Sequence, residues 1–357
     1  MRSPYTNLPP RAFWRTGVTS QEPESIAELY RPKFPITSRT RVATAGSCFA
    51  QHIAKHLRAR AFSVVDAEPA PAGLDANSAA QFGFGLYSAR YGNIYTARQL
   101  LQLFREAEGT FRPADFVWQK DGRYFDAMRP SVEPGGLSKA DFVRNCRAYH
   151  LRHLPAIFET SDVFVFTLGL TETWMHAPSG TVYPTAPGTI AGCYDPAVHQ
   201  FRNLTFQEVY GDLVEFIALA ERQNPDLVFL LTVSPVPLTA TATGNHVLAA
   251  TTYSKSVLRA VAGQLSEERE NVDYFPSYEI ITGAQSRGRF FSDNLRSVTP
   301  QGVSAVMDVF FAAHGTGEIP LQPWPVDDTE QHASSPPSYN DEDEVVCEEI
   351  LLDAFAG

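Results

Sequence analysis

The chain has 357 residues, of which 44% are hydrophobic, and this is enough for one large domain or two small ones. No run approaches the roughly 20 apolar residues that a membrane-spanning helix needs, and the polar N-terminus shows no secretory signal. The four cysteines are too widely spaced for a zinc site or a disulfide framework. We therefore expect a cytoplasmic protein without a metal ion or another cofactor.

The net charge of -11 is concentrated at one end of the chain. Residues 315–357 contain 11 of the 40 Asp and Glu residues and no Lys or Arg, which leaves 29 acidic and 29 basic side chains in residues 1–314. Binding to nucleic acid normally needs a basic face. The charge distribution therefore argues against nucleic acid as a partner.

Residues 1–40 are polar and interrupted by proline, and we expect them to form an extension packed on the body of the protein. Five apolar segments follow whose residues do not alternate with polar ones, which is typical of strands buried on both faces. These segments are Val42–Ala45, Phe62–Val65, Val163–Leu168, Leu227–Val233 and Val272–Phe275. Segments with a helical spacing of apolar residues lie between and after them, at 49–60, 96–107, 139–158, 205–223, 248–267 and 300–311.

This alternation predicts a single α/β domain over residues 41–314, with a parallel sheet covered by helices on both sides. The long insertion between the second and third strands, roughly residues 67–160, should form helical structure over the pocket. In such sheets, ligands bind beyond the C-terminal ends of the strands. Residues that directly follow a strand are therefore the candidates for the functional site.

The acidic residues 315–357 are rich in Pro and Ser up to about residue 340 and predict a largely flexible tail. Its last part permits two interpretations. It either solvates the protein, or it forms a short helix over residues 343–355 that docks on a protein partner or on the body of its own chain.

Ser47 follows the first predicted strand at the point where the strand becomes a helix. Backbone N–H groups at a helix N-terminus stabilise an oxyanion, and a serine that attacks a carbonyl needs this help together with a general base. Two other interpretations remain open. Ser47 could simply cap the helix, or the neighbouring Cys48 could be the nucleophile.

The five residues Gly46-Ser47-Cys48-Phe49-Ala50 resemble the motif after which the GSCFA family is named, and further segments resemble family blocks in the same order. These segments are Tyr91–Thr96, Thr167–Trp174, Ser234–Pro237, Tyr253–Lys255 and Phe275–Glu279. The family is similar to the SGNH hydrolases, which are serine esterases and acyltransferases. The resemblance implies a three-layer α/β/α sandwich with a flavodoxin-like, five-stranded parallel sheet. It also implies a serine esterase or O-acyltransferase that acts on an acyl ester of a small molecule or a bacterial glycan.

The resemblance also assigns roles to individual residues. Ser47 matches the nucleophile, and its backbone N–H is expected in the oxyanion hole. Residues expected to complete the oxyanion hole or to bind substrate are Gly92, Asn93, Gly169, Thr171, Glu172 and Trp174. Asp293 matches the aspartate of the last block, which orients the catalytic histidine.

The pattern breaks at this last block, because Arg296 stands where the histidine is expected. A guanidinium group has a pKa above about 12 and cannot accept the serine proton. Three explanations remain open. His246, or alternatively His176, supplies the base; Asp293 activates Ser47 directly or through water; or the protein is a catalytically silent glycan- or acyl-binding protein in which Arg296 anchors an anionic group.

Overall fold

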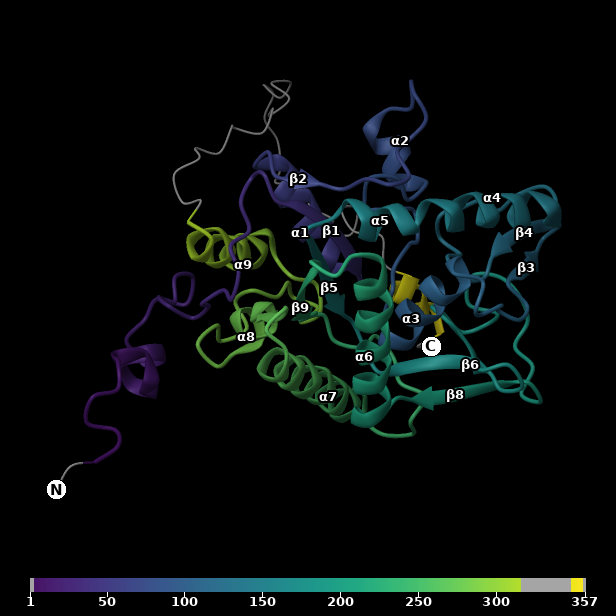
Figure 1. The fold of residues 1–357 in the computed structure, drawn as a ribbon. Helices are drawn as coiled ribbons and strands as arrows, with labels where there is room; N and C mark the ends of the chain where they lie inside the picture. The colour runs from purple at the N-terminus through teal and green to yellow at the C-terminus, as the bar shows by residue number, and fades with distance from the viewer. Residues whose placement is uncertain (1–2, 316–347, 356–357) are drawn as a thin grey trace, which may run out of the picture.

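The computed structural model of the protein describes residues 3–315 and 348–355, and its centre is a five-stranded sheet in which every pair of neighbouring strands is parallel (Figure 1). The strand order is β10-β9-β5-β1-β2, which is the flavodoxin-like order. The strands are β1 Arg41–Gly46, β2 Ser63–Val64, β5 Val163–Leu168, β9 Val228–Val233 and β10 Val272–Phe275. The predicted sheet is thus confirmed, and each strand falls on a predicted apolar segment.

Helices connect these strands, and most of them lie where the spacing of apolar residues predicts them. They are α1 Phe49–Ala59, α2 Ala76–Gln81, α3 Ala97–Ala107, α4 Ala140–His153, α5 Pro155–Thr160, α6 Phe206–Gln223, α7 Val247–Glu268, α8 Ser277–Thr282 and α9 Pro300–Ala313. The long helix expected over residues 139–158 is instead two helices. Proline lacks an N–H and favours the first turn of a helix, so α5 starts at Pro155 instead of continuing α4.

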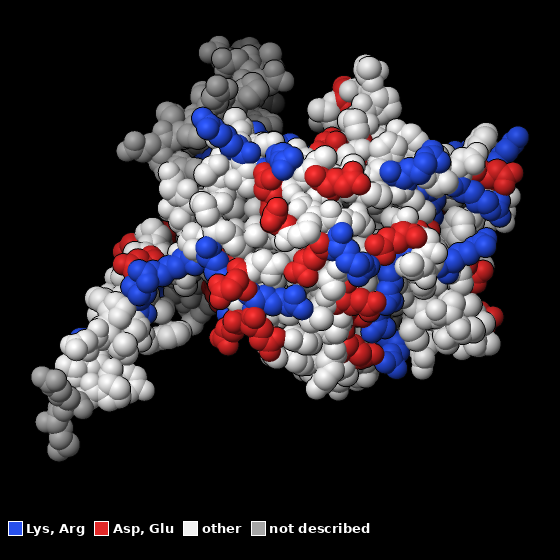
Figure 2. All heavy atoms as spheres, in the orientation of Figure 1, with Lys and Arg blue, Asp and Glu red and all other residues white. Residues whose placement is uncertain are grey.

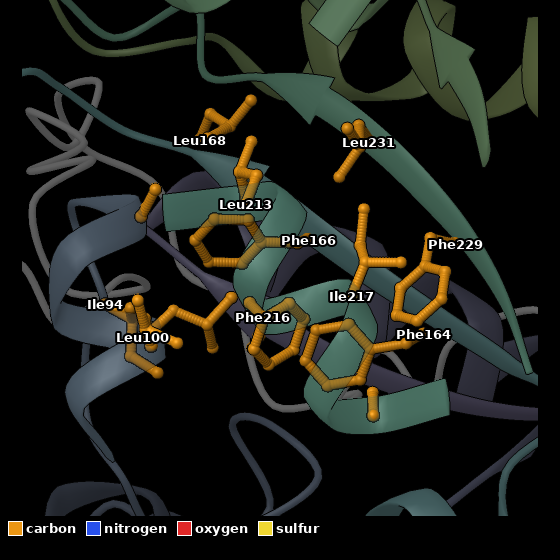
Figure 3. Packing of buried hydrophobic residues seen from close by; sticks show 14 of the residues in the cluster. Ile94, Leu100, Phe164, Phe166, Leu168, Leu213, Phe216, Ile217, Phe229 and Leu231 are labelled. Carbon is orange, nitrogen blue, oxygen red and sulfur yellow. The ribbon is translucent and has the colours of Figure 1, made fainter. Parts of the chain in front are cut away.

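The residues of β5 divide between the two faces of the sheet, as the pleat of a strand requires. Phe164, Phe166 and Leu168 point to one face, where they pack with residues of α3, α6 and α7. Figure 3 shows this packing, in which the rings of Phe164 and Phe216 lie 5.3 Å apart. The alternate residues Val163 and Val165 pack with α1, α8 and α9 on the other face. This arrangement makes the three-layer sandwich.

The structure also contains strands that the sequence analysis missed. An antiparallel hairpin, β3 Val117–Lys120 with β4 Arg123–Asp126, lies in the insertion that was expected to be helical. A three-stranded antiparallel sheet follows β5, in the order β7-β6-β8, and comprises β6 Glu172–His176, β7 Thr181–Tyr183 and β8 His199–Asn203. The Asp121-Gly122 turn, with positive φ at both residues, is the local signal that identifies the hairpin.

A buried group of charged residues fastens α4 to this hairpin. Arg147 contacts the carboxylates of Glu106 and Asp126, and Arg129 contacts Asp126 at 2.8 Å. Asp126, Arg129 and Arg147 are all buried. Because each buried charge has an oppositely charged partner, the group fixes α4 relative to β4 and α3.

The N-terminal residues begin away from the body and reach it further along the chain (Figure 1). They include two short helical turns, η1 Pro10–Ala12 and η2 Arg15–Thr19. Tyr30 donates a hydrogen bond to Asp273 at 2.8 Å, and the N–H of Ile36 donates to Nδ1 of His314 at 3.1 Å. These contacts tie the extension to β10 and to the end of α9.

Acidic and basic side chains are intermixed over the face in Figure 2, in agreement with the even balance of charge in residues 1–314. Among the residues that the structure describes, no helix has the length and apolar composition needed to cross a membrane. Of the C-terminal residues, 348–355 form a short 3-10 helix, η4 Glu348–Phe355. The rest of the predicted tail, residues 316–347 and 356–357, lies outside the described residues.

Candidate functional site

Ser47 lies at the C-terminal edge of the sheet, between β1 and α1, where the sequence predicts it. The turn requires the preceding glycine: Gly46 has a φ of 142°, and a Cβ there would lie 2.5 Å from the carbonyl oxygen of Thr167. The backbone N–H of Ser47 donates to that same oxygen at 3.1 Å, as an extension of the β1–β5 ladder. This N–H is therefore engaged with Thr167 in this structure, and its role in an oxyanion hole stays a prediction.

The Ser47 side chain is only 2% exposed, and no described residue forms a hydrogen bond with its hydroxyl oxygen. Burial of a hydroxyl without a hydrogen bond costs free energy, and the hydroxyls of Thr44 on β1 and Thr167 on β5 are in the same state. Gly169 makes room for Ser47, since a Cβ at Gly169 would lie 2.9 Å from the Ser47 Cβ and 2.9 Å from the Tyr95 carbonyl oxygen. The Ser47 side chain is thus closely surrounded, and the space that it occupies depends on the missing side chain of Gly169.

Lys255, on α7, is a buried charged residue close to Ser47 to which the sequence assigned no role. Its side chain is 2% exposed and lines the same small cavity as Ser47, Tyr95 and Gly169. The ammonium nitrogen donates to the carbonyl oxygen of Gly169 at 2.6 Å. Its position among the apolar residues of the predicted helix 248–267 could have indicated a buried lysine.

Asn93 belongs to a buried polar group that reaches the Ser47 backbone through Tyr87. Its Oδ1 accepts a hydrogen bond from Gln51 at 3.1 Å, and the Tyr87 hydroxyl lies within hydrogen-bond distance of both this Oδ1 and the Ser47 carbonyl oxygen. Gly92 precedes it with a φ of 67°, which lets the chain turn towards β1. The N–H of Ile94 then donates to the carbonyl oxygen of Gly46 at 2.8 Å. The Gly92–Asn93 pair is thereby fixed next to the Gly46–Ser47 turn.

The side chains of Thr171, Glu172 and Trp174 contact other parts of the chain, and none of them forms a hydrogen bond with the Ser47 hydroxyl. Thr171 donates to Oδ1 of Asn203 at 2.6 Å. Glu172 accepts a hydrogen bond from Thr241 at 2.7 Å, and burial raises the pKa of its carboxyl group. Trp174 packs edge-on against Tyr194 and Phe201. Glu172 and Trp174 lie on β6 of the three-stranded sheet, and Thr171 directly precedes this strand.

A cleft of about 620 Å³ opens at Cys48, the residue after Ser47. Arg296 lines it together with His52 and His56 of α1, so the arginine in place of the expected histidine does reach this edge of the sheet. The Nδ1 of His56 donates to the His52 carbonyl oxygen at 2.9 Å, and burial lowers the pKa of His56. The cleft therefore offers a guanidinium group beside two imidazoles.

The residues proposed to activate Ser47 have other surroundings. His246 is exposed and caps α7, where its Nδ1 accepts the N–H of Leu248 at 3.1 Å. His176 lies 2.8 Å from the Ser179 hydroxyl, on β6. Asp293 is exposed in the loop before α9. Catalytic roles for these residues remain predictions. Within the described ranges, no cluster of three or more His, Cys, Asp or Glu side chains suits a metal ion.

The sheet has the flavodoxin-like strand order, and Ser47 directly follows its first strand, so the protein is a three-layer α/β/α sandwich with a serine at the ligand-binding edge of the sheet. The model of the GSCFA family matches residues 41–310, and the chain belongs to this family. It is also similar, with 16% identity and a TM-score of 0.34, to a crystal structure from Parabacteroides merdae described as a GDSL-like lipase; the match covers 80% of this chain and 100% of that one. No curated protein matches the chain significantly.

Proposed function

We propose that the protein is a serine esterase or O-acyltransferase in which Ser47 attacks an acyl ester, and that the ester belongs to a small molecule or a bacterial glycan. The observation that carries the proposal is the Ser47 hydroxyl, which is buried at the edge of the sheet and has no hydrogen bond to any described residue. The C-terminal edge of a parallel sheet, where this hydroxyl lies, is where such folds bind their ligands. Ser47 lies one residue from a cleft large enough for a small ligand.

Lys255 is our candidate for the group that takes the Ser47 proton. Burial disfavours the ammonium form of a lysine, so a buried amine can act as a base where an exposed one cannot. The serine oxygen would bond to the acyl carbon while the amine takes the hydroxyl proton. The same proton would then pass to the departing alcohol oxygen as the ester bond breaks. Water or a sugar hydroxyl would finally accept the acyl group.

Covalent labelling with a fluorophosphonate probe tests this function, because the reactive serine oxygen displaces fluoride from phosphorus. We expect labelling of the full chain and none of Ser47→Ala. Lys255→Met should slow labelling by about 100-fold, in line with the usual loss of a general base, while His246→Ala should label at the normal rate. If His246→Ala is the slow variant instead, His246 is the base. A folded but unlabelled protein would contradict the serine-hydrolase proposal.

Arg296 supports a second candidate function, in which the protein binds a glycan or an acyl compound without turning it over. Its guanidinium group lines the cleft beside Cys48, where it can pair with an anionic group of a ligand. This function predicts saturable ligand binding that Arg296→Gln weakens and Ser47→Ala leaves unchanged. Isothermal titration of both variants separates it from catalysis.

A further inference from the structure

The C-terminal segment 348–355 packs on the body of the protein and buries a carboxylate close to the Gly46–Ser47 turn. Figure 1 shows this segment in yellow near α3, and the Glu348 side chain is only 3% exposed. Its Oε2 accepts hydrogen bonds from the Asn93 amide and from the Tyr95 hydroxyl, the latter at 2.6 Å, and its Oε1 accepts one from the Ser131 hydroxyl. Three neutral donors from two parts of the chain thus converge on one carboxylate.

Two of the three donors, Asn93 and Tyr95, also form hydrogen bonds with the body of the protein. Oδ1 of Asn93 accepts from Gln51, which turns the amide nitrogen of Asn93 to the opposite side, towards the carboxylate. The side chain of Gln99 bridges the backbone of the two donors: it accepts the Tyr95 N–H and donates to the Asn93 carbonyl oxygen, each at 2.9 Å. The pocket is therefore preorganised for a group that accepts hydrogen bonds.

This pocket adjoins the candidate active site. Tyr95 supplies one donor to the carboxylate and also lines the small cavity that contains Ser47. Asp353, five residues after Glu348, lines the larger cleft together with Arg296. One short segment therefore reaches both the donor pocket and the cleft.

We propose that Asn93, Tyr95 and Ser131 form a binding subsite for the carboxylate group of a ligand, and that Glu348 occupies this subsite from within the chain. The ligand that displaces it is a compound with a free carboxylate, and for the proposed reaction this means an acyl ester that also carries a carboxylate. The substrate class rests on the proposed function. Carboxylate binding at the pocket does not, because it does not require Ser47 to react.

The variant Glu348→Ala tests the subsite in the full chain, since the substitution removes a volume close to that of one acetate ion. We expect [13C]acetate, followed by NMR titration, to bind Glu348→Ala at least tenfold more tightly than the wild-type chain. Glu267→Ala, which removes an exposed acidic group from α7, is the matched control and should behave as wild type. Adding Asn93→Ala to Glu348→Ala should abolish the gain, and neutral acetamide should bind at least tenfold more weakly than acetate.

Acetate binding to a folded Glu348→Ala that is no tighter than to Glu267→Ala would overturn the proposal, and so would equal binding of acetamide. Glu348→Gln, which keeps the size of the side chain, covers the case in which the alanine variant does not fold. It should release the segment, so that limited proteolysis within residues 348–355 becomes at least threefold faster than in Glu267→Gln; equal rates would contradict a carboxylate subsite. The double variant Ser47→Ala with Glu348→Ala must still bind acetate, which separates this proposal from the catalytic one.

Discussion

Two glycines shape the surroundings of Ser47 at the scale of single residues. Gly46 allows the chain to leave β1 with a positive φ, and Gly169 leaves the space that the serine side chain fills. Neither position tolerates a Cβ without movement of backbone atoms. The position of Gly46 directly after an apolar strand is visible in the sequence, whereas the contact of Gly169 with Ser47 joins residues that lie far apart in the chain.

Replacement of Gly46 by alanine should destabilise the protein by about 2 kcal/mol or more, because the new Cβ meets the Thr167 carbonyl oxygen and the backbone conformation is strained. Urea denaturation of the full chain measures the change. The control is Gly211→Ala on α6, where a Cβ meets nothing within 4 Å and the backbone is helical. That variant should gain about 0.5–1 kcal/mol, since alanine favours a helix over glycine. Equal effects of the two substitutions would contradict the steric argument.

The candidate site shows what local sequence patterns can and cannot reveal. Ser47 and Asn93 were identified because each belongs to a recognisable segment at the edge of the predicted sheet. Lys255 and Glu348 were not, since their roles depend on contacts with residues that are distant in sequence. The spacing of apolar residues predicts which side of a helix is buried, but it does not predict which residues a buried side chain contacts.

The elements themselves were predictable to different degrees, for physical reasons. The central strands are buried on both faces, so each reads as a continuous apolar segment, and β5 is the clearest case. Strands β3 and β8 are short and partly exposed. Because they contain polar residues, they do not form continuous apolar segments in the sequence. The hairpin could still have been found from its Asp121-Gly122 turn. Strands of such peripheral sheets are therefore harder to predict from the pattern of apolar residues than strands of a buried core.

Helix α4 depends on buried charge more than on an apolar face. Arg147→Ala should lower the free energy of unfolding by about 3–5 kcal/mol, because it leaves the carboxylates of Glu106 and Asp126 buried with fewer partners. Arg144→Ala, on the exposed side of the same helix, removes a surface ion pair with Asp141 and should cost less than about 1 kcal/mol. Chemical denaturation of both variants tests the difference. A comparable, small loss in each would show that the buried pairs do not stabilise α4.

For the whole molecule, the attachment of the N-terminal extension makes stability depend on pH. His314 accepts the Ile36 N–H, and burial lowers the pKa of His314 to about 4, although the nearby Asp273 carboxylate opposes this shift. The unfolded chain takes up a proton at this histidine below about pH 6.5, while the folded protein remains neutral there. Stability should therefore fall as the pH drops from 6.5 towards 4 and level off below that range.

His314→Asn tests this dependence, since the asparagine oxygen can accept the same N–H but does not titrate. Between pH 7.5 and 5.5, the wild-type chain should lose about 1.4 kcal/mol more stability than the variant. His150 also has a pKa lowered to about 4 by burial, so a slope should persist in the variant. Denaturant titrations at the two pH values provide the measurement. Parallel losses in both proteins would show that His314 does not titrate as described.

The placement of Glu348 has a consequence for synthesis of the protein. The residues that bind its carboxylate precede it by 217 to 255 positions, so a ribosome that adds about 5–20 residues per second completes them roughly 10–50 s earlier. All five strands of the central sheet are also made before it. The domain can thus fold around an empty pocket while translation continues. Docking of the C-terminal segment is then a separate, late step in maturation, and a free carboxylate compound in the cell has the first opportunity to occupy the site.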